Sequence, residues 1–174
     1  MAEYSIRLAN KHDLLKLAQI EKEAGKRFSG MGLVDHLLGQ TLPPAKLIEL
    51  IEKKQVLIAC VKNVPVGFAA VSVIGKNAYL EEIDVLPEHG RQGHGARLIQ
   101  LIIEWATLNE LNALILSTFL DVQWNAPYYQ KFGFRVLDVH EWNDDLKQKR
   151  REEKEHGMPI DKRVFMQLDL HKSI

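Results

Sequence analysis

The 174-residue chain contains 23 lysines and arginines and 23 aspartates and glutamates, so its formal net charge at pH 7 is zero. Hydrophobic residues make up 46% and charged residues 26% of it, as in ordinary globular domains. We therefore expect a single domain over residues 1–174, long enough to bury a sizeable core. The lack of excess positive charge argues against a general nucleic-acid binder.

Two other classes of protein are also disfavoured. No apolar run approaches the roughly 18 residues that a membrane-spanning helix needs, and the first residues lack the apolar stretch of a secretory signal. We therefore expect a cytoplasmic protein with no membrane partner. Cys60 is the single cysteine, which excludes an internal disulfide and a multi-cysteine metal site. Its apolar neighbours predict a buried, inert thiol, and no metal is expected.

The first part of the chain predicts one strand and two helices. Residues 4–9 alternate in polarity, which is typical of a strand. Asn10 or Asp13 can cap the first helix. That helix is expected over residues 13–25, where the following side chains recur at helical spacing: Leu14, Leu17, Ala18, Glu21 and Ala24. After a glycine-rich break, Pro43 and Pro44 predict the start of a second helix over 44–53.

The middle of the chain predicts a hairpin and a β-α-β unit. Strands are expected over 55–62, 65–74 and 78–86, and the turn Asn63-Val64 joins the first two as a hairpin. A helix over 96–109 then separates strand 78–86 from the apolar strand 113–118. This order of elements makes those two strands parallel.

The last part predicts a short helix over 126–132 and strands over 133–142 and 163–170. Residues 143–157 are almost wholly polar and indicate a solvated helix or an excursion between the strands. The complete order predicts an α/β (α+β) domain, in which about four helices flank a mixed central sheet of about seven strands.

The segment HGRQGHGARL (89–98) lies between a predicted strand and a predicted helix. The first turn of a helix offers free backbone N–H groups and a partial positive charge, and glycine lets an anion approach closely. The segment can therefore be a structural turn or a phosphate-binding loop. It is not a Rossmann fingerprint, because Leu98 stands where the third glycine belongs, and it lacks the Gly-Lys-Ser/Thr of a P-loop.

The flanking residues favour phosphate binding. The segment LEEIDVLPEHGRQGHGARLIQLIIEWA resembles the coenzyme-A-binding core of the GNAT superfamily of N-acetyltransferases. YYQKFGFRV (128–136) looks like the Tyr-x-Lys-x-Gly-Phe segment of the same family. With the order of elements, this resemblance covers nearly the whole chain and implies a GNAT-like fold. The segment Trp-Asn-Ala-Pro-Tyr-Tyr (124–129) indicates a distinct subgroup.

Two positions depart from the family pattern. Gly90 stands where the family usually has an arginine or glutamine, and Arg91, one place later, can supply the positive charge. Val122 stands where the family often has an asparagine. Asn125, four residues before Tyr129, can still contact the cofactor.

The resemblance implies an N-acetyltransferase in which a primary amine attacks the thioester of acetyl-CoA directly. It also implies that the loop amides hold the pyrophosphate, and that the backbone of one strand holds the pantetheine and polarises the thioester carbonyl. The expected cofactor-binding residues are Ile83, Val85, Arg91, Gln92, Gly93, His94, Gly95, Ala96 and Asn125.

Three residues are expected to act on protons. Tyr129 matches the family's general acid, which protonates the coenzyme-A thiolate; a core tyrosine is the alternative. Glu81 and Glu82 are the candidate bases. Successive strand residues face opposite sides, so only one of them can point into a given side of the site. We favour Glu82, where the family often has a glutamate, and we expect His89 and His94 to lie at the surface or contact phosphate.

The acceptor is expected to be a small-molecule or peptide amine, and the sequence does not identify it. In the family, the acceptor side is formed by the equivalents of residues 25–44 and 138–162. Candidate lining residues are Phe28, Met31, Leu33, His36, Trp124 and Trp142, although packing in the core explains each equally well. A homodimer is compatible with the family analogy. The alternative functions are a non-catalytic acyl-CoA-binding or sensing domain of the same fold, and a structural module with an empty turn.

Overall fold

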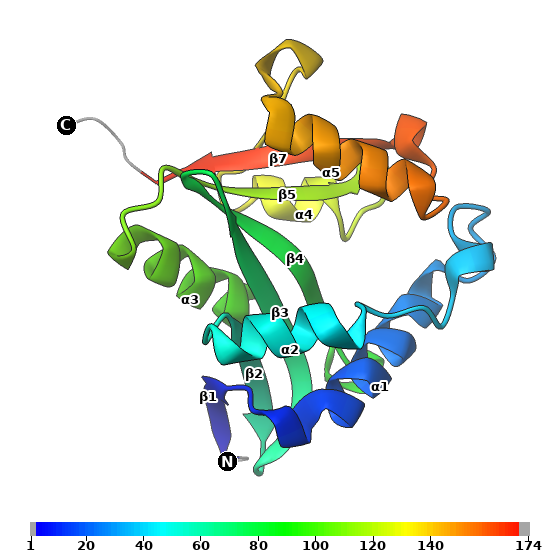
Figure 1. Cartoon of the computed structure of the whole chain (residues 1–174). Coiled ribbons are helices and arrows are strands. Elements are labelled where there is room, and N and C mark those ends of the chain that lie inside the picture. Colours follow the sequence, from blue (N-terminus) through cyan, green and yellow to red (C-terminus); the bar gives the residue numbers. More distant parts are fainter. Residues whose placement is uncertain (1–2, 171–174) are drawn as a thin grey trace. The chain divides into compact units, whose positions relative to one another are not determined.

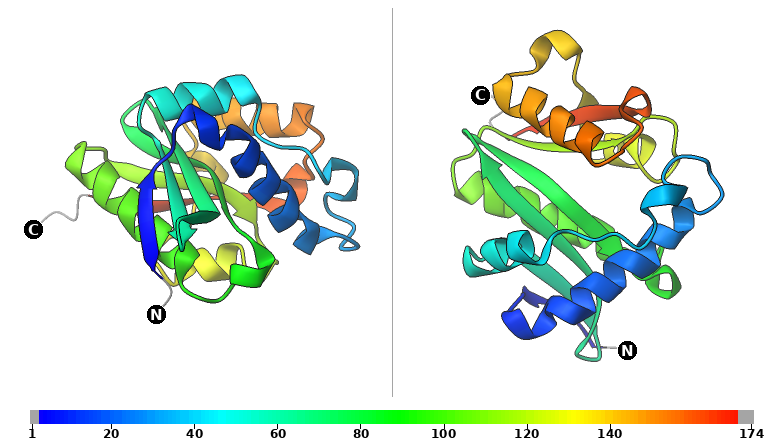
Figure 2. Two further views of the ribbon diagram at one scale, coloured as in Figure 1. Left: turned by 90° about the horizontal axis from the view of Figure 1, so that it is seen from below. Right: turned by 45° about the vertical axis from the view of Figure 1, so that its right-hand side comes forward.

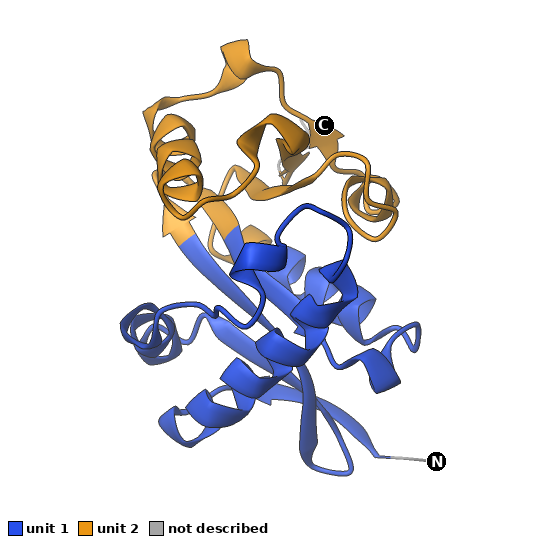
Figure 3. Ribbon diagram, turned by 90° about the vertical axis from the view of Figure 1, so that its right-hand side faces the viewer, with its two compact units in different colours: residues 1–72, 80–105 blue, residues 73–79, 106–174 orange. Residues whose placement is uncertain are grey.

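The computed structural model describes residues 3–170. Seven strands form a mixed sheet in the order β1-β2-β3-β4-β5-β7-β6, and five α-helices accompany them. The predicted mixed sheet is therefore confirmed, with one helix more than expected. The chain divides into two compact units, residues 1–72 and 80–105 (unit 1) and residues 73–79 and 106–174 (unit 2), which are coloured separately in Figure 3.

Unit 1 is a layered structure in which helices cover both faces of the strands. Its elements are β1 (Tyr4–Leu8), α1 (Leu14–Gly25), α2 (Pro44–Glu52), β2 (Val56–Val61), most of β3 (Val64–Ile74), the end of β4 (Asn77–Val85) and most of α3 (His94–Leu108). Within this unit, α1 and α2 lie on one side of the strands and α3 lies on the other (Figure 2). Their apolar stripes face the strands, and Leu17, Ile20, Leu50, Ile58 and Phe68 are fully buried.

The hairpin β2–β3 forms as predicted, but its turn lies one residue earlier than expected. β2 and β3 pair antiparallel, and Val61 pairs with Val64. The two turn residues are therefore Lys62 and Asn63, with positive φ values of 49° and 61°. A two-residue turn between right-twisted strands needs positive φ at both positions, and a β-branched residue such as Val64 is poorly suited to that conformation.

Unit 2 is formed around the antiparallel pair β5 (Ala113–Phe119) and β7 (Arg163–Asp169), which lie side by side in Figure 1. The unit also contains α4 (Ala126–Gln130), β6 (Arg135–Val136) and α5 (Asp144–Glu155). β4 pairs parallel with β5 at Ala78–Leu114 and Tyr79–Ile115, which confirms the predicted β-α-β crossover. Phe165 is fully buried in the core of the unit.

The strand predicted over 133–142 is wrong for most of its length. Only Arg135–Val136 is a strand, and a 3-10 turn over Val139–Glu141 follows it. Asp138 accepts a hydrogen bond from the backbone N–H of His140, and Glu141 accepts one from the backbone N–H of Asp138. These local bonds satisfy backbone groups that a longer strand would have paired across the sheet. The polar residues that follow form a helix, α5, capped by Asn143.

Gly67 on β3 permits a close approach of β4 within unit 1. A Cβ atom placed on Gly67 would lie 2.8 Å from the backbone oxygen of Asp84 and 3.3 Å from the Cα of Val85. The backbone N–H of Leu86 donates to the oxygen of Val66 (2.8 Å) just beyond this point. The missing side chain therefore fixes the position of the end of β4, where the candidate site residues lie.

We expect Gly67→Ala to lower the free energy of unfolding by about 1–3 kcal/mol, because the new methyl group meets backbone that cannot rotate away. Urea denaturation measures this change. Gly25→Ala is the control, since its Cβ would meet no atom within 4 Å and its φ is an ordinary −61°. That variant should be neutral or slightly stabilised. Equal effects of the two substitutions would contradict the close approach described here.

Candidate active site

The glycine-rich loop adopts the conformation of a helix N-terminus open to solvent. A 3-10 turn over Pro87–His89 follows β4, and α3 begins at His94, two residues earlier than predicted. Arg91 and Gly93 have positive φ values of 58° and 85°. The exposed position of Gly93 has open space around it, since a Cβ there would meet no atom within 4 Å. The backbone N–H of Arg97 donates to the oxygen of Gly93, which closes the first helical turn.

The loop therefore has the donors that an anion needs. The amides from Gln92 to Ala96 precede the first intrahelical bond, and the helix dipole places partial positive charge at this end. Arg91 and Gln92 are exposed, whereas Gly95 and Ala96 are half-buried. Gln92 donates from its side chain to the backbone oxygen of Glu88 (3.3 Å). Strand, glycine loop and helix N-terminus together fit a pyrophosphate group.

His94 differs from the sequence expectation, because its side chain faces the interior. It is only 8% exposed and stacks on Tyr4 of β1, with ring centroids 4.9 Å apart. Burial and the neighbouring His89 lower the pKa of His94. The imidazole is therefore neutral at physiological pH and packs against β1, so it is not an exposed phosphate ligand. Only its backbone amide belongs to the loop surface.

The end of β4 carries the residues predicted to hold the pantetheine. Ile83 and Val85 are half-buried and belong to unit 1. The described pairing between β4 and β5 covers Ala78–Leu114 and Tyr79–Ile115, and neither Ile83 nor Val85 takes part in it.

The two candidate bases have different environments. Glu81 accepts a hydrogen bond of 2.6 Å from the hydroxyl of Ser72 on β3. Glu82 instead lies against two other carboxyl groups, those of Glu21 on α1 and Asp84 on β4. Glu82 and Asp84 are two residues apart on the strand, which places both on one face. The sequence analysis did not identify Glu21 or Asp84 as site residues.

Burial and the proximity of the other carboxyl groups favour the protonated forms of Glu21 and Asp84. Glu82 is the hydrogen-bond partner of both Glu21 and Asp84. Burial and the charge of Glu82 raise the pKa of Glu21 to about 8. Burial, followed by the charges of Glu82 and Glu21, raises the pKa of Asp84 well above its ordinary value, and a smaller effect of Arg27 opposes this rise. We call Glu21, Glu82 and Asp84 the carboxyl cluster.

The carboxyl cluster also anchors the segment before α2. Both side-chain oxygens of Glu21 accept from the backbone N–H of Leu42, at 2.8 Å and 3.1 Å. Oδ2 of Asp84 is buried and has no hydrogen-bond partner. Across residues 3–170, no group of histidine, cysteine, aspartate and glutamate side chains is arranged to hold a metal ion.

Tyr129 and Asn125 belong to unit 2. Tyr129 is half-buried on α4, and its ring makes edge contacts with Tyr128 and Phe134. Asn125 precedes α4, and its side-chain oxygen accepts from the hydroxyl of Thr118 (2.5 Å) and from the backbone N–H of Phe119 (3.4 Å). This oxygen therefore holds the α4 segment against β5. A contact of Asn125 with the cofactor stays a prediction.

Trp142, a candidate acceptor residue, packs in the core of unit 2. Its ring meets Phe165 edge-on at 5.0 Å, and the guanidinium of Arg150 lies 5.1 Å from it. This placement supports the packing explanation for Trp142. Met31 lies in unit 1 and is 42% exposed.

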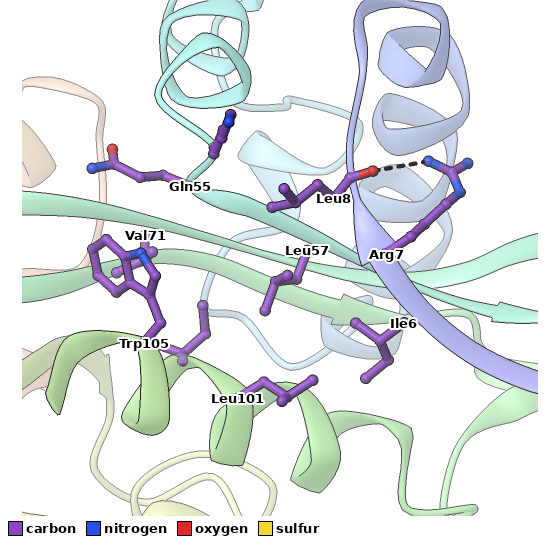
Figure 4. Close-up of a pocket in the computed structure, with 10 residues that line it drawn as sticks. Ile6, Arg7, Leu8, Gln55, Leu57, Val71, Leu101 and Trp105 are labelled. Carbon is purple, nitrogen blue, oxygen red and sulfur yellow. Dashed lines mark hydrogen bonds between the residues drawn. The ribbon is translucent and has the colours of Figure 1, made fainter. Parts of the chain in front are cut away.

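A separate apolar pocket of about 310 Å³ lies in unit 1, on the α3 side of the strands (Figure 4). Ile6, Leu57, Val71, Leu101 and Trp105 form its apolar wall, and Arg7 lies at its rim. None of the predicted site residues lines it. The pocket therefore does not account for the carboxyl cluster or the glycine loop.

A sequence profile of the acetyltransferase (GNAT) family matches residues 25–134, more than half of the chain. The chain belongs to this family. The match includes the glycine loop, the carboxyl groups of β4 and Tyr129. It confirms the resemblance noted in the sequence and makes this chain a GNAT protein.

Solved GNAT structures share the fold. PaiA N-acetyltransferase from Thermoplasma acidophilum, in complex with coenzyme A, is 18% identical with a TM-score of 0.73; the match covers 96% of this chain and 99% of that one. The ribosomal-protein-S18-alanine N-acetyltransferase from Escherichia coli is 17% identical with a TM-score of 0.68; the match covers 99% of this chain and 97% of that one. A GNAT family acetyltransferase from Brucella melitensis, in complex with acetyl-CoA, is 17% identical with a TM-score of 0.61; the match covers 100% of this chain and 92% of that one.

The raised pKa of Glu21 predicts that stability falls as the pH rises. The unfolded chain loses the Glu21 proton near pH 4.5, whereas the folded protein keeps it up to a pKa of about 8. The folded state therefore binds more protons in this window, and the free energy of unfolding falls as pH rises through it. Asp84 contributes with the same sign. We expect the melting temperature to fall between about pH 5 and about pH 8.

Thermal unfolding scans of Glu21→Gln at several pH values test whether Glu21 causes this loss of stability. Glutamine keeps an oxygen for Leu42 but cannot ionise, so the variant should lose less stability over the same pH range and exceed the wild type at the alkaline end. Glu23→Gln on the same helix is the control, because Glu23 pairs with Lys26 at the surface. Parallel pH curves for the wild type and Glu21→Gln would contradict the raised pKa of Glu21.

Proposed function

We propose that this GNAT protein is an N-acetyltransferase that transfers the acetyl group of acetyl-CoA to a primary amine by direct attack on the thioester. One observation carries the proposal: the glycine loop at the start of α3 follows β4, and β4 bears Glu82, whose carboxyl group lies beside those of Glu21 and Asp84. An anion site and a proton acceptor thus lie on consecutive segments of one unit.

Coenzyme binding is assigned to the loop and to the end of β4. The amides from Gln92 to Ala96, with the charge of Arg91, would hold the pyrophosphate, and the backbone of Ile83 and Val85 would hold the pantetheine. The open space at Gly93 suits a phosphate group that approaches the backbone closely. When bound, acetyl-CoA supplies a thioester, which is the activated acyl group. The solved complexes with coenzyme A and acetyl-CoA support this assignment by analogy of fold.

Glu82 is proposed as the base, and Tyr129 as the acid. The amine nitrogen forms a bond to the carbonyl carbon of the thioester, and the carbon–sulfur bond breaks. Glu82 accepts the proton that the amine loses, directly or through water, and Tyr129 donates a proton to the leaving thiolate. We prefer Glu82 to Glu81 because Glu81 already accepts a hydrogen bond from Ser72. A thiol nucleophile is not required, and Cys60 is buried.

We expect Gly93→Val to abolish most coenzyme A binding with the fold retained, because a β-branched side chain cannot keep the left-handed backbone at this position. Isothermal titration with coenzyme A measures the affinity, and circular dichroism checks the fold. Gly39→Val is the matched control, since Gly39 has the same φ of 85° and equally open surroundings outside the loop. Unchanged affinity of Gly93→Val for coenzyme A would contradict the loop assignment.

Two conservative substitutions test the proton transfers. In a thiol-release assay with acetyl-CoA and a panel of amines, we expect Tyr129→Phe and Glu82→Gln each to lower kcat by about a hundredfold or more, with coenzyme affinity unchanged. Tyr128→Phe and Glu81→Gln are the neighbouring controls and should retain activity. Tight coenzyme binding without turnover of any amine, and no effect of Tyr129→Phe, would instead support a non-catalytic acyl-CoA sensor.

A further inference from the structure

The pocket on the α3 side of unit 1 has an apolar wall that the proposed reaction does not use. Trp105 and Leu101 reach into it from α3, and Leu57 reaches into it from β2 (Figure 4). These three side chains are half-buried, so each keeps apolar surface that the protein itself does not cover, whereas Val71 and Ile102 are fully buried. A ligand with an apolar body would remove the uncovered surface from water. The volume of about 310 Å³ lies within the range of small-molecule sites, about 300–1,000 Å³.

The rim of the pocket favours a small molecule over a docked protein. A helix or a second copy of the chain needs a broad apolar surface around the hollow. Of the large hydrophobic residues that are exposed within residues 3–170, only Leu8 lines the pocket. The other exposed lining residues are Arg7 and Lys54. The apolar surface therefore ends at a mostly polar rim, as in sites for small ligands.

The charge at the rim indicates the kind of ligand. Within the described residues, 3–170, the lining contains two cations, Arg7 and Lys54, and no aspartate or glutamate. Arg7 is already neutralised, because its guanidinium donates to both carboxylate oxygens of Asp13 at 2.8 Å. Lys54 has no ion pair in this part of the chain, and Gln55 beside it offers a side-chain amide. An ammonium and an amide beside an apolar hollow fit a carboxylate.

The backbone that carries these two polar side chains is held in place. Lys54 follows α2 with a φ of 57°, and its N–H donates to the oxygen of Ile51. The N–H of Gln55 donates to the oxygen of Leu50, and the oxygen of Gln55 accepts from the N–H of Val71, at 2.9 Å and 3.0 Å. The polar end of the pocket is therefore ordered before a ligand arrives, which lowers the cost of binding.

We propose that this pocket binds a small carboxylate with an apolar body. The body packs between Trp105 and Leu57, and the carboxylate accepts hydrogen bonds from the ammonium of Lys54 and the amide of Gln55. None of the residues assigned to acetyl transfer lines the pocket. The ligand is therefore an additional one, distinct from the coenzyme and the amine, and the inference does not depend on the proposed function.

The experiment uses the whole chain labelled with nitrogen-15, and 4-phenylbutyrate as the probe. The chain contains three tryptophans, whose indole N–H groups give separate signals in a nitrogen–proton correlation spectrum, and Trp105→Phe identifies one of them. We expect 4-phenylbutyrate to shift the Trp105 signal until it saturates and to leave the signals of Trp124 and Trp142 in place. The same shift is expected with coenzyme A present, because the two sites are separate.

The charge preference is tested with two analogues of the probe. We expect 4-phenylbutyramide, which is neutral, and 4-phenylbutylammonium, which is a cation, to bind at least about threefold more weakly than 4-phenylbutyrate, as for an ion pair at an exposed position. Lys54→Gln should bind the carboxylate and the amide equally. Lys53→Gln is the matched control and should keep the preference, since Lys53 pairs with Glu49 at 2.6 Å and does not line the pocket.

A second pair of variants tests the apolar wall. Leu101→Trp should fill the hollow and weaken binding of 4-phenylbutyrate and of its amide by at least about tenfold. Leu108→Trp on the same helix is the control, because Leu108 is 84% exposed and lies outside the pocket. Circular dichroism checks the fold of each variant. If Leu101→Trp does not fold, Leu101→Phe, with its smaller ring, replaces it and should show a loss in the same direction.

Four results would overturn the inference. They are no saturable shift of the Trp105 signal, equal affinity of the wild type for the carboxylate and the amide, unchanged binding by a folded filling variant, and displacement of 4-phenylbutyrate by coenzyme A. The last result would place the probe in the coenzyme site. Coenzyme A binding and thiol release judge the proposed function separately, so either idea can fail while the other holds.

Discussion

The close approach of β4 to Gly67 is the constraint on which the arrangement of unit 1 depends. With no side chain at this position, the backbone of β4 lies against β3 up to Val85, and the hydrogen bond from Leu86 to Val66 then ends the strand pairing. The position of this backbone determines where Glu82 and Asp84 stand relative to α1. A glycine without a role in chemistry thereby allows the carboxyl-bearing end of β4 to lie close to β3.

Much of this organisation could be predicted from local patterns in the sequence. The alternation of β4, the glycines of the loop and the apolar face of α3 each have a strong local signature, and the parallel pairing of β4 with β5 follows from their connection. The strand predicted over 133–142 failed because Asp138 and Glu141 bond the backbone locally, and hydrophobicity alone does not record this competition. The inward side chain of His94 depends on Tyr4, ninety residues earlier in the chain.

The carboxyl cluster shows most clearly what a linear sequence hides. Glu21 occurs among the apolar positions of its helix, at the spacing of Leu17 and Ala24, and a charged residue at such a position was a signal that it faces inward. Asp84 lies two residues after Glu82, which placed both on one face of the strand. Neither signal shows that the two elements meet. That meeting depends on how α1 packs on the strands, and it turns two unremarkable acidic residues into partners of the candidate base.

The stacking of His94 on Tyr4 has a consequence for the affinity of the loop. Because the first residue of α3 is buried against β1, the amides around it are already ordered before any ligand arrives. That segment loses its conformational freedom during folding. Binding an anion therefore carries no further entropic cost for ordering the segment. Preorganisation of this kind raises affinity by lowering the cost of ordering the binding segment. The contact between Tyr4 and His94 thus orders the start of α3, next to the loop that we propose holds the phosphates.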